Sequence, residues 1–563
     1  MTPTLTPRPR PLPRPSTAPR TERGGFGFLE TLHAEWTKFR TVRGWVLGMA
    51  GALLVTIVVG LLSTAAPAGS GGGAPNPKGS GAATSYPKGP GGEAVSDSFH
   101  FVHKTLTGDG SLTVSLRSLT GWADTGTGGE PTGGKSAGGK PEGGEPGGGK
   151  PAGGNPAGGT GAQPWAKAGI IVKESLTQGS PYAAVMATGR HGVRMQYDYT
   201  HDTAGPSGKV AEESPYWLRL VRSGDSLTGY TSTDGSRFTK IGSTNLPGLA
   251  RTVRAGLFAT SPEAKQDTAA GVGFGPAVAT GAFSRPGLTG SWSHGRWSGT
   301  QVGGDAGTSG SYTNTVKGGF TRTDGGGFTV TGAGDIAPVV GGPVMGAGFS
   351  VENFLVGTFA GLIVVIAVGT VFITGEYRRG LLRTTMAATP LRGRVLGAKG
   401  LVAGGAAFGI GLVAAAITVP IGERSARGRG FHVFPVTSAT ELRVVVGTGL
   451  LCATTAVLAL GVGTLLRRSA TAVALVIASL VLPFLLATSG VLPPDVSEWL
   501  LRVTPAAGFA IQQTLPHYAQ VLSVYEPSTG YYPLAPWAGF AVLCGYAALA
   551  FGLAVFRLRG RDV

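Results

Sequence analysis

The sequence predicts a polytopic α-helical membrane protein of six spans, with a large all-β, jelly-roll-like domain inserted after the first span. Apolar residues gather in six runs of about 20 residues, the length needed to cross a hydrocarbon core of roughly 30 Å. Between the first and second runs lies a long polar stretch with short alternating segments of strand length. A single soluble globular domain is therefore excluded.

Composition limits the chemistry that the chain can perform. Its 563 residues are 42% hydrophobic and 14% charged, with a net charge of +17. The two cysteines, Cys452 and Cys544, both lie in apolar runs, so we expect no disulfide framework, zinc site or thiol nucleophile. No catalytic or metal-ligating signature occurs elsewhere, and we predict no enzyme activity, metal or cofactor in this chain.

The six predicted spans contain few charges, which disfavours an ion-coupled carrier with carboxylates inside the membrane. The fifth span contains Pro483, so we expect a kink there. The spans are Trp45–Ser63, Phe354–Thr374, Leu401–Ile421, Val444–Leu466, Ala470–Ser489 and Leu534–Phe556.

The basic residues predict the orientation. They concentrate in residues 1–44, in the connection 376–399, at Arg467 and Arg468, and after Phe556. By the positive-inside rule these segments face the cytoplasm. We expect a multi-pass plasma-membrane protein with both termini cytoplasmic and residues 64–350 extracellular. Because the charge is explained by topology, no nucleic-acid partner is expected.

The inserted region consists of strand-like segments interrupted by a low-complexity stretch. Residues 125–163 repeat Pro and Gly-Gly, which cannot bury enough apolar surface to order. Within them, Gly129–Ser136 matches a phosphate-binding loop, but neither a strand nor a helix flanks it, so nucleotide binding is not expected. The predicted strands are Ala168–Lys173, Tyr182–Ala187, Val193–Tyr199, Tyr216–Arg222, Leu227–Ser232 and Thr252–Phe258.

These patterns divide the chain into seven parts. They are a disordered Pro/Arg-rich cytoplasmic tail (1–25), an interfacial amphipathic helix (26–44), the first span (45–63), a linker (64–95), a β-sandwich (96–280) with the disordered insert 125–163, an additional β segment (281–350), and spans two to six (351–563) with the cytoplasmic connection 376–399. The segment 281–350 either adds strands to the sandwich or forms a second small lobe.

The hairpin Tyr216–Phe238 resembles those of concanavalin-like and laminin-G-like jelly rolls, although Phe238 stands where those domains often have Trp. The resemblance covers roughly 96–262 and implies a fold commonly used for contact with cell-surface glycans or proteins. Aromatic residues on the strands could stack on a sugar, but at this spacing they are more often core. They are Tyr182, Tyr197, Tyr199, Trp217 and Tyr230.

Two segments next to the spans have an ordered pattern. In 26–44, Leu29, Leu32, Trp36 and Phe39 share one helical face, which predicts a helix lying on the cytoplasmic surface. In 376–399, apolar residues at helical spacing are followed by Pro390, which predicts a short helix able to dock into a partner.

Together these features resemble the permease subunit of type-2 ATP-binding-cassette (ABC-2) transporters, in an actinobacterial-looking form. The matching features are the Ala34-Glu-Trp-Thr-Lys-Phe-Arg-Thr41 segment, the Glu376 to Lys399 connection with Gly380 and Thr389-Pro390, the six spans and the Arg559-Gly-Arg-Asp-Val563 ending. They cover about residues 28–66 and 350–563. The family usually has a small loop where this chain carries nearly 290 residues, which puts the substrate class in doubt.

The resemblance implies a division of labour between subunits. ATP and magnesium would be bound by a separate cassette ATPase, and two permease subunits, identical or different, would pair around a substrate path in the lipid bilayer. The expected cassette-coupling residues are Glu376, Arg378, Arg379, Gly380, Arg383, Pro390, Arg392 and Lys399. Those expected of the interfacial helix are Glu35, Trp36, Lys38, Phe39 and Arg40.

Two other functions remain open at the level of sequence. A membrane-anchored receptor would use the outer sandwich to bind a glycan or a protein, and explains the large insert better than transport does. A surface glycan hydrolase would need two facing carboxylates, for which Glu174, Asp198 and Asp225 are candidates without an evident pairing.

Overall fold

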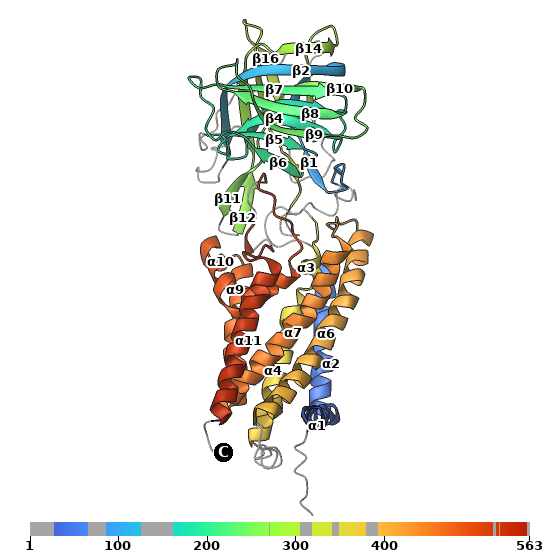
Figure 1. Ribbon diagram of the computed structural model, residues 1–563, viewed down its shortest axis with the longest axis vertical. Helices are drawn as coiled ribbons and strands as arrows, with labels where there is room; N and C mark the ends of the chain where they lie inside the picture. Colours follow the sequence, from blue (N-terminus) through green and yellow to red (C-terminus); the bar gives the residue numbers. More distant parts are fainter. Residues whose placement is uncertain are drawn as a thin grey trace, which may run out of the picture.

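The computed structural model places a β-rich domain at one end of an elongated molecule and a bundle of helices at the other (Figure 1). It describes residues 27–65, 86–124, 161–268, 271–303, 318–340, 348–378, 392–521, 525–527 and 530–559. The predicted tail 1–25 and nearly all of the predicted insert 125–163 lie outside these residues.

Six helical segments are long and apolar enough to cross a membrane, and each contains or nearly coincides with a predicted span. They are α2 (Arg43–Ala65), α4 (Gly357–Arg378), α6 (Arg392–Gly428), α7 (Ser438–Leu466), the segment formed by α8 (Ser469–Val476), η2 (Ile477–Val481) and α9 (Leu482–Thr488), and α11 (Pro536–Arg559). Within the described part of the chain, α6 and α7 extend furthest beyond their apolar runs, because polar turns at their ends continue the helix.

The fifth segment accommodates Pro483 with a π-helical turn. Pro483 has no N–H to donate to the carbonyl of Ser479. The π-helical turn η2 contains Ser479 and ends two residues before Pro483. The N–H of Leu482 instead reaches the carbonyl of Ile477, five residues earlier. Such π turns are one way in which helices tolerate a local defect.

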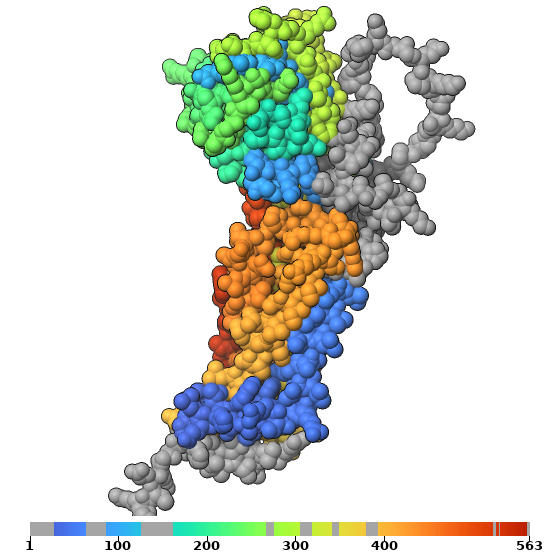
Figure 2. Space-filling model, turned by 90° about the vertical axis from the view of Figure 1, so that its right-hand side faces the viewer, coloured from blue at the N-terminus to red at the C-terminus, as the bar shows by residue number. Residues whose placement is uncertain are grey.

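Within the described residues, four shorter helices flank the bundle. At the end away from the β-rich domain, α1 (Phe28–Thr41) lies across the long helices (Figure 2). We call this end the α1 end and the other the sheet end. At the sheet end lie α3 (Val351–Phe354), α10 (Pro494–Val503) and the 3-10 helix η3 (Pro505–Gln512), all eight residues of which are buried.

The β-rich domain is built around one 25-residue strand, β2 (Phe99–Ala123), which the sequence analysis did not predict. Near its start, Val102 lies opposite Leu257 of β10 and Gly299 of β15. Further along, Leu112 lies opposite Leu220 of β7 and Leu288 of β14. Its last residues pair with β13. Because β2 has partners on both sides, it joins the described strands of this sheet into one unit of 14.

All six predicted strands are present within this domain. The strands in the described residues are β1 (Val95–Asp97), β2, β3 (Lys167–Lys173), β4 (Tyr182–Thr188), β5 (Val193–Tyr197), β6 (His201–Ala204), β7 (Tyr216–Ser223), β8 (Ser226–Ser232), β9 (Thr239–Asn245), β10 (Thr252–Thr260), β11 (Ala264–Thr268), β12 (Gly271–Gly275), β13 (Ala277–Phe283), β14 (Gly287–Trp292), β15 (Ser298–Val302), β16 (Gly319–Arg322), β17 (Phe328–Gly332) and β18 (Ile336–Pro338).

The sheet folds back on itself into two layers around an apolar core. Gly229 of β8 lies over Val185 of β4 and Met195 of β5, so closely that a Cβ on this glycine would overlap both. Even-numbered residues of β2 and β3, such as Val114 and Ile170, face this core. Four strands of the segment 281–350 join the same sheet: β14 and β15 pair with β2, β17 pairs with β13, and β16 pairs with β17. The fifth, β18, pairs with β1 instead. Within the described residues the segment therefore adds strands to the domain and forms no separate lobe.

A ribbon of two short strands covers the other face of β3, β4 and β10. There β1 pairs with β18, and Phe99, Ile171 and Phe258 form a second apolar core beneath it. Both faces of β3 are thereby covered, and all seven of its residues are buried. Val95 of the ribbon and the preceding Ala94 belong to the predicted linker 64–95, so its described end is part of the folded domain.

Candidate functional site

Four charged side chains, three of them buried and one, Lys38, 41% exposed, meet in a cluster at the α1 end. The ammonium of Lys399 lies 2.6 Å from Glu35 Oε2 and 2.7 Å from Glu376 Oε1. Lys38 Nζ lies 2.8 Å from Glu35 Oε1 and 3.7 Å from Glu376 Oε1. We call these four residues the ion cluster. They come from α1, α4 and α6, so the cluster joins three helices.

The local sequence explains why each side chain reaches the cluster. Glu35 and Lys38 are three residues apart on α1 and therefore share one helical face. Glu376 lies in the last turn of α4, and Lys399 lies about two turns into α6. Phe372, one turn before Glu376, places its ring 4.5 Å below the Lys399 ammonium, which adds a cation–π contact.

The charges of the cluster balance within a buried environment. Lys399 is fully buried, and Glu35 and Glu376 are 1% and 5% exposed. Isolated, such charges would be unfavourable, whereas two lysines and two glutamates neutralise one another. Burial alone would lower the pKa of Lys38, but its hydrogen bonds and charge interactions with Glu35 and Glu376 outweigh burial and raise it. The second oxygen of Glu376, Oε2, is buried and accepts no hydrogen bond from the described residues.

The cluster brings together four of the residues expected from sequence, two from each predicted segment. Glu376 and Lys399 are the first and last residues of the predicted connection 376–399, so both of its ends are tied to α1. Arg378 is exposed, and Arg392 donates to the carbonyl of Leu558 over 2.9 Å. Arg379, Gly380, Arg383 and Pro390 lie outside the described residues.

The predicted apolar face of α1 is divided between two environments. Phe39 is buried against the edge of Phe372, with ring centroids 5.4 Å apart. Leu29 and Trp36 are exposed, and so is Arg40. Sequence reasoning missed Phe372, whose ring contacts both Phe39 and Lys399; its position one turn before Glu376 is the only signal that could have indicated it.

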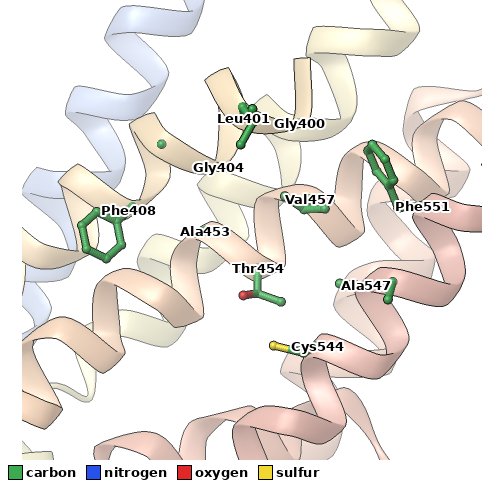
Figure 3. Close-up of a pocket in the computed structure, with 12 residues that line it drawn as sticks. Gly400, Leu401, Gly404, Phe408, Ala453, Thr454, Val457, Cys544, Ala547 and Phe551 are labelled. Carbon is green, nitrogen blue, oxygen red and sulfur yellow. The ribbon is translucent and has the colours of Figure 1, made fainter. Parts of the chain in front are cut away.

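A second feature is a groove of about 520 Å³ between α6, α7 and α11 (Figure 3). Gly400, Leu401 and Phe408 line it from α6, Val457 from α7 and Phe551 from α11. Its polar groups are few: the hydroxyl of Thr454 and the thiol of Cys544 lie next to each other across it. The groove suits an apolar occupant.

The aromatic residues considered for sugar stacking do not form one surface. Tyr182 and Tyr199 are buried in the second core, with ring centroids 4.8 Å apart. Tyr197, Trp217 and Tyr230 are half-buried. The two tyrosines therefore serve packing.

Of the three carboxylates considered for glycan hydrolysis, Glu174 is half-buried, and Asp198 and Asp225 have structural partners. Asp198 accepts a hydrogen bond from the N–H of Tyr182 over 3.3 Å, and Asp225 accepts one from Gly248 over 2.9 Å. Burial raises the pKa of Asp198, although the hydrogen bond from Tyr182 opposes this. Among the described residues no group of three or more His, Cys, Asp or Glu side chains could hold a metal ion.

A polar junction connects the β-rich domain to the sheet end of the helices. The side-chain amide of Gln520 donates to the carbonyl of Tyr199 over 3.0 Å, and both groups are buried. Lys265 forms an ion pair with Glu526. The domain is thus held on the helices by side-chain contacts.

Comparison with protein-family models and with curated proteins gives no match. Among solved structures, a functionally unknown protein from Saccharomyces cerevisiae is 14% identical, with 37% of this chain and 84% of that chain covered and a TM-score of 0.21. Scytalido-glutamic peptidase, solved with a transition state analog inhibitor, is 9% identical, with 43% and 100% covered and a TM-score of 0.24.

Proposed function

We propose that the chain is the permease subunit of an ABC-2 type exporter, which forms a substrate path and is coupled to a separate ATPase subunit. The observation that carries this proposal is the ion cluster, which joins α1 to Glu376 and Lys399, the two ends of the connection 376–399. Its substrate would be a hydrophobic or amphipathic compound, a lipid or an envelope component.

The cluster provides a mechanical reason for this assignment. A segment that transmits the closure of an ATPase subunit to the membrane must be firmly attached to the helices at its two ends, so that they move with it. Leaving one charge of a buried ion pair without its partner costs about 3–5 kcal/mol. A force on residues 379–391 would therefore move α4, α6 and α1 together, and the change would be passed to the bundle as alternating exposure of the path.

The proposed orientation places the α1 end in the cytoplasm and the β-rich domain outside. The basic residues of 376–399 and of the last turn of α11 support it. A cysteine introduced at exposed Ser236 should react with a membrane-impermeant maleimide in intact cells. One introduced at Thr31 on α1 should react only after permeabilisation, and the reverse pattern would overturn the orientation.

The decisive experiment is purification of the tagged chain in mild detergent, with mass spectrometry of bound proteins and an ATPase assay. A stoichiometric cassette protein with ATPase activity is the expected result. Replacing both Arg383 and Arg392 by Ala should reduce its recovery and abolish export. If both survive, the proposed coupling surface is wrong.

A second candidate, a membrane-anchored receptor, is favoured by one observation. The β-rich domain is held on the helices by the buried Gln520 to Tyr199 hydrogen bond, so a ligand bound outside could be sensed by the bundle. Purification of a complex that lacks any ATPase, but retains a glycan or protein bound to the outer domain, would make this the better proposal.

A further inference from the structure

Two arginines lie beyond one end of the groove between α6, α7 and α11. Arg394 lies seven residues before Leu401 on α6, and Arg559 lies eight residues after Phe551 on α11. Both arginines are exposed. A face of α6 that includes Leu401, Gly405 and Phe408 also includes Arg394, because these positions are separated by seven, four and three residues.

The side chain of Arg559 lies close to the first turn of α6, the turn that carries Arg394. A Cβ on Gly393, which precedes Arg394, would lie 3.6 Å from Nη2 of Arg559. Arg392 holds the two helices together there through its hydrogen bond to the carbonyl of Leu558. The guanidinium of Arg559 therefore lies against the first turn of α6, where the helix dipole adds positive potential.

The spacing between the arginines and the groove matches a phospholipid. Arg394 lies six residues before Gly400, and Arg559 lies eight residues after Phe551. At 1.5 Å per residue, the two arginines lie about 9–12 Å along their helices from the nearest groove residues. A phospholipid with an acyl chain in the apolar groove would thus have its headgroup on the side of the groove where the arginines lie.

We propose that this groove and the arginines at its end bind an anionic phospholipid of the leaflet at the α1 end, with one acyl chain in the groove and the phosphate between Arg394 and Arg559. Basic sites between helices attract anionic headgroups in this way. The inference does not rest on the proposed transport function.

Gly405 makes the groove testable. It is exposed, and a Cβ built on it meets no atom within 4 Å, so a larger side chain there would fill the groove without displacing the protein. Cys544 lines the groove, whereas the other cysteine, Cys452, is buried. In a Cys452→Ser background, the rate of Cys544 alkylation reports whether the groove is occupied.

The experiment compares the full chain in nanodiscs of phosphatidylcholine with and without phosphatidylglycerol. We expect phosphatidylglycerol to slow alkylation of Cys544 and to be retained in native mass spectrometry. Replacing Arg394 or Arg559 by Ala should weaken its binding about fivefold each. Gly405→Leu should abolish retention while leaving the thermal midpoint within a few degrees of the parent.

Arg468→Ala is the matched control, because this arginine is exposed at the same end and precedes α8, which packs on α4 and α7 instead. It should leave retention unchanged. Equal retention of the two lipids, or an equal loss in Arg468→Ala, would overturn the proposal. So would a dimer that Gly405→Leu converts to monomer with lipid retention intact, since a second copy would then occupy the groove.

Discussion

The ammonium of Lys399 lies 2.6 Å from the carboxylate of Glu35, although the two residues are 364 positions apart in the chain. This contact, with the second one from Lys399 to Glu376, fixes the amphipathic helix α1 to the long helices α4 and α6. Because all three side chains are buried, the contact is a strong constraint on how the α1 end of the bundle can move.

Removing the lysine alone should therefore be more harmful than removing it together with both carboxylates. Lys399→Met leaves two buried carboxylates with only the partly exposed Lys38 as a partner, and we expect a loss of about 3–5 kcal/mol in stability. The triple variant Lys399→Met, Glu35→Gln, Glu376→Gln should lose clearly less. The stability of both variants is measured by thermal unfolding in detergent and by hydrogen exchange of the amides of α1. A triple variant as unstable as the single one would mean that packing, and not charge, holds α1.

A similar argument applies to the core of the β-rich domain. Lys173 and Asp97 are fully buried, with Nζ 2.7 Å from Oδ2, and the hydroxyl of Tyr199 donates to the same oxygen over 2.7 Å. Asp97→Asn should destabilise the domain by about 3–5 kcal/mol, because it leaves the Lys173 charge unpaired. Tyr199→Phe should cost about 1–2 kcal/mol. The order of the two thermal midpoints checks the prediction, and a reversal would contradict it.

Glu263 should make stability depend on pH. Burial raises the pKa of its carboxyl to about 7, above the unfolded value near 4.5. The folded state thus binds the proton more tightly, so this contribution is complete below about pH 4.5 and is lost as pH rises through 7. At most it amounts to about 3 kcal/mol. As pH rises from about 4.5 to 7, the stability of Glu263→Gln should increase relative to that of the parent protein. Glu213→Gln, a substitution of an exposed residue in the same domain, should keep the same pH dependence of stability as the parent.

The junction between the domain and the helices should depend on Gln520. Gln520→Ala leaves the buried carbonyl of Tyr199 without this donor, at a cost of about 1–3 kcal/mol. We expect faster amide exchange in residues 513–521 and around Tyr199. Gln513→Ala would be a poor control because Gln513 also accepts from Tyr532, so exposed Arg502→Ala is preferred. Unchanged amide exchange at the junction would contradict the prediction, because other contacts would then be enough to hold the β-rich domain on the helices.

Local patterns were enough to predict the helices and several strands. A run of about 20 apolar residues has few alternatives in a membrane, because unpaired backbone groups are too costly there. Tyr216–Arg222 and its neighbours alternate with period two, which only a half-buried strand satisfies. The strand β2 escaped prediction because Gly108 and Gly110 interrupt its pattern, and its pairing depends on five strands that come later in the chain.

The amino-acid order specifies which segments are apolar, which are basic, and where short strands alternate, since each depends on residues close together in the chain. The contacts of Lys399 with Glu35 and Glu376, the contact of Lys173 with Asp97, and the position of Arg394 and Arg559 at one end of a groove become visible only in the folded chain. These relationships join residues far apart in sequence, and no local pattern carries them. The two ion pairs arise when packing buries charges, because each buried charge must then find a partner. The two arginines come together because α6 and α11 pack side by side.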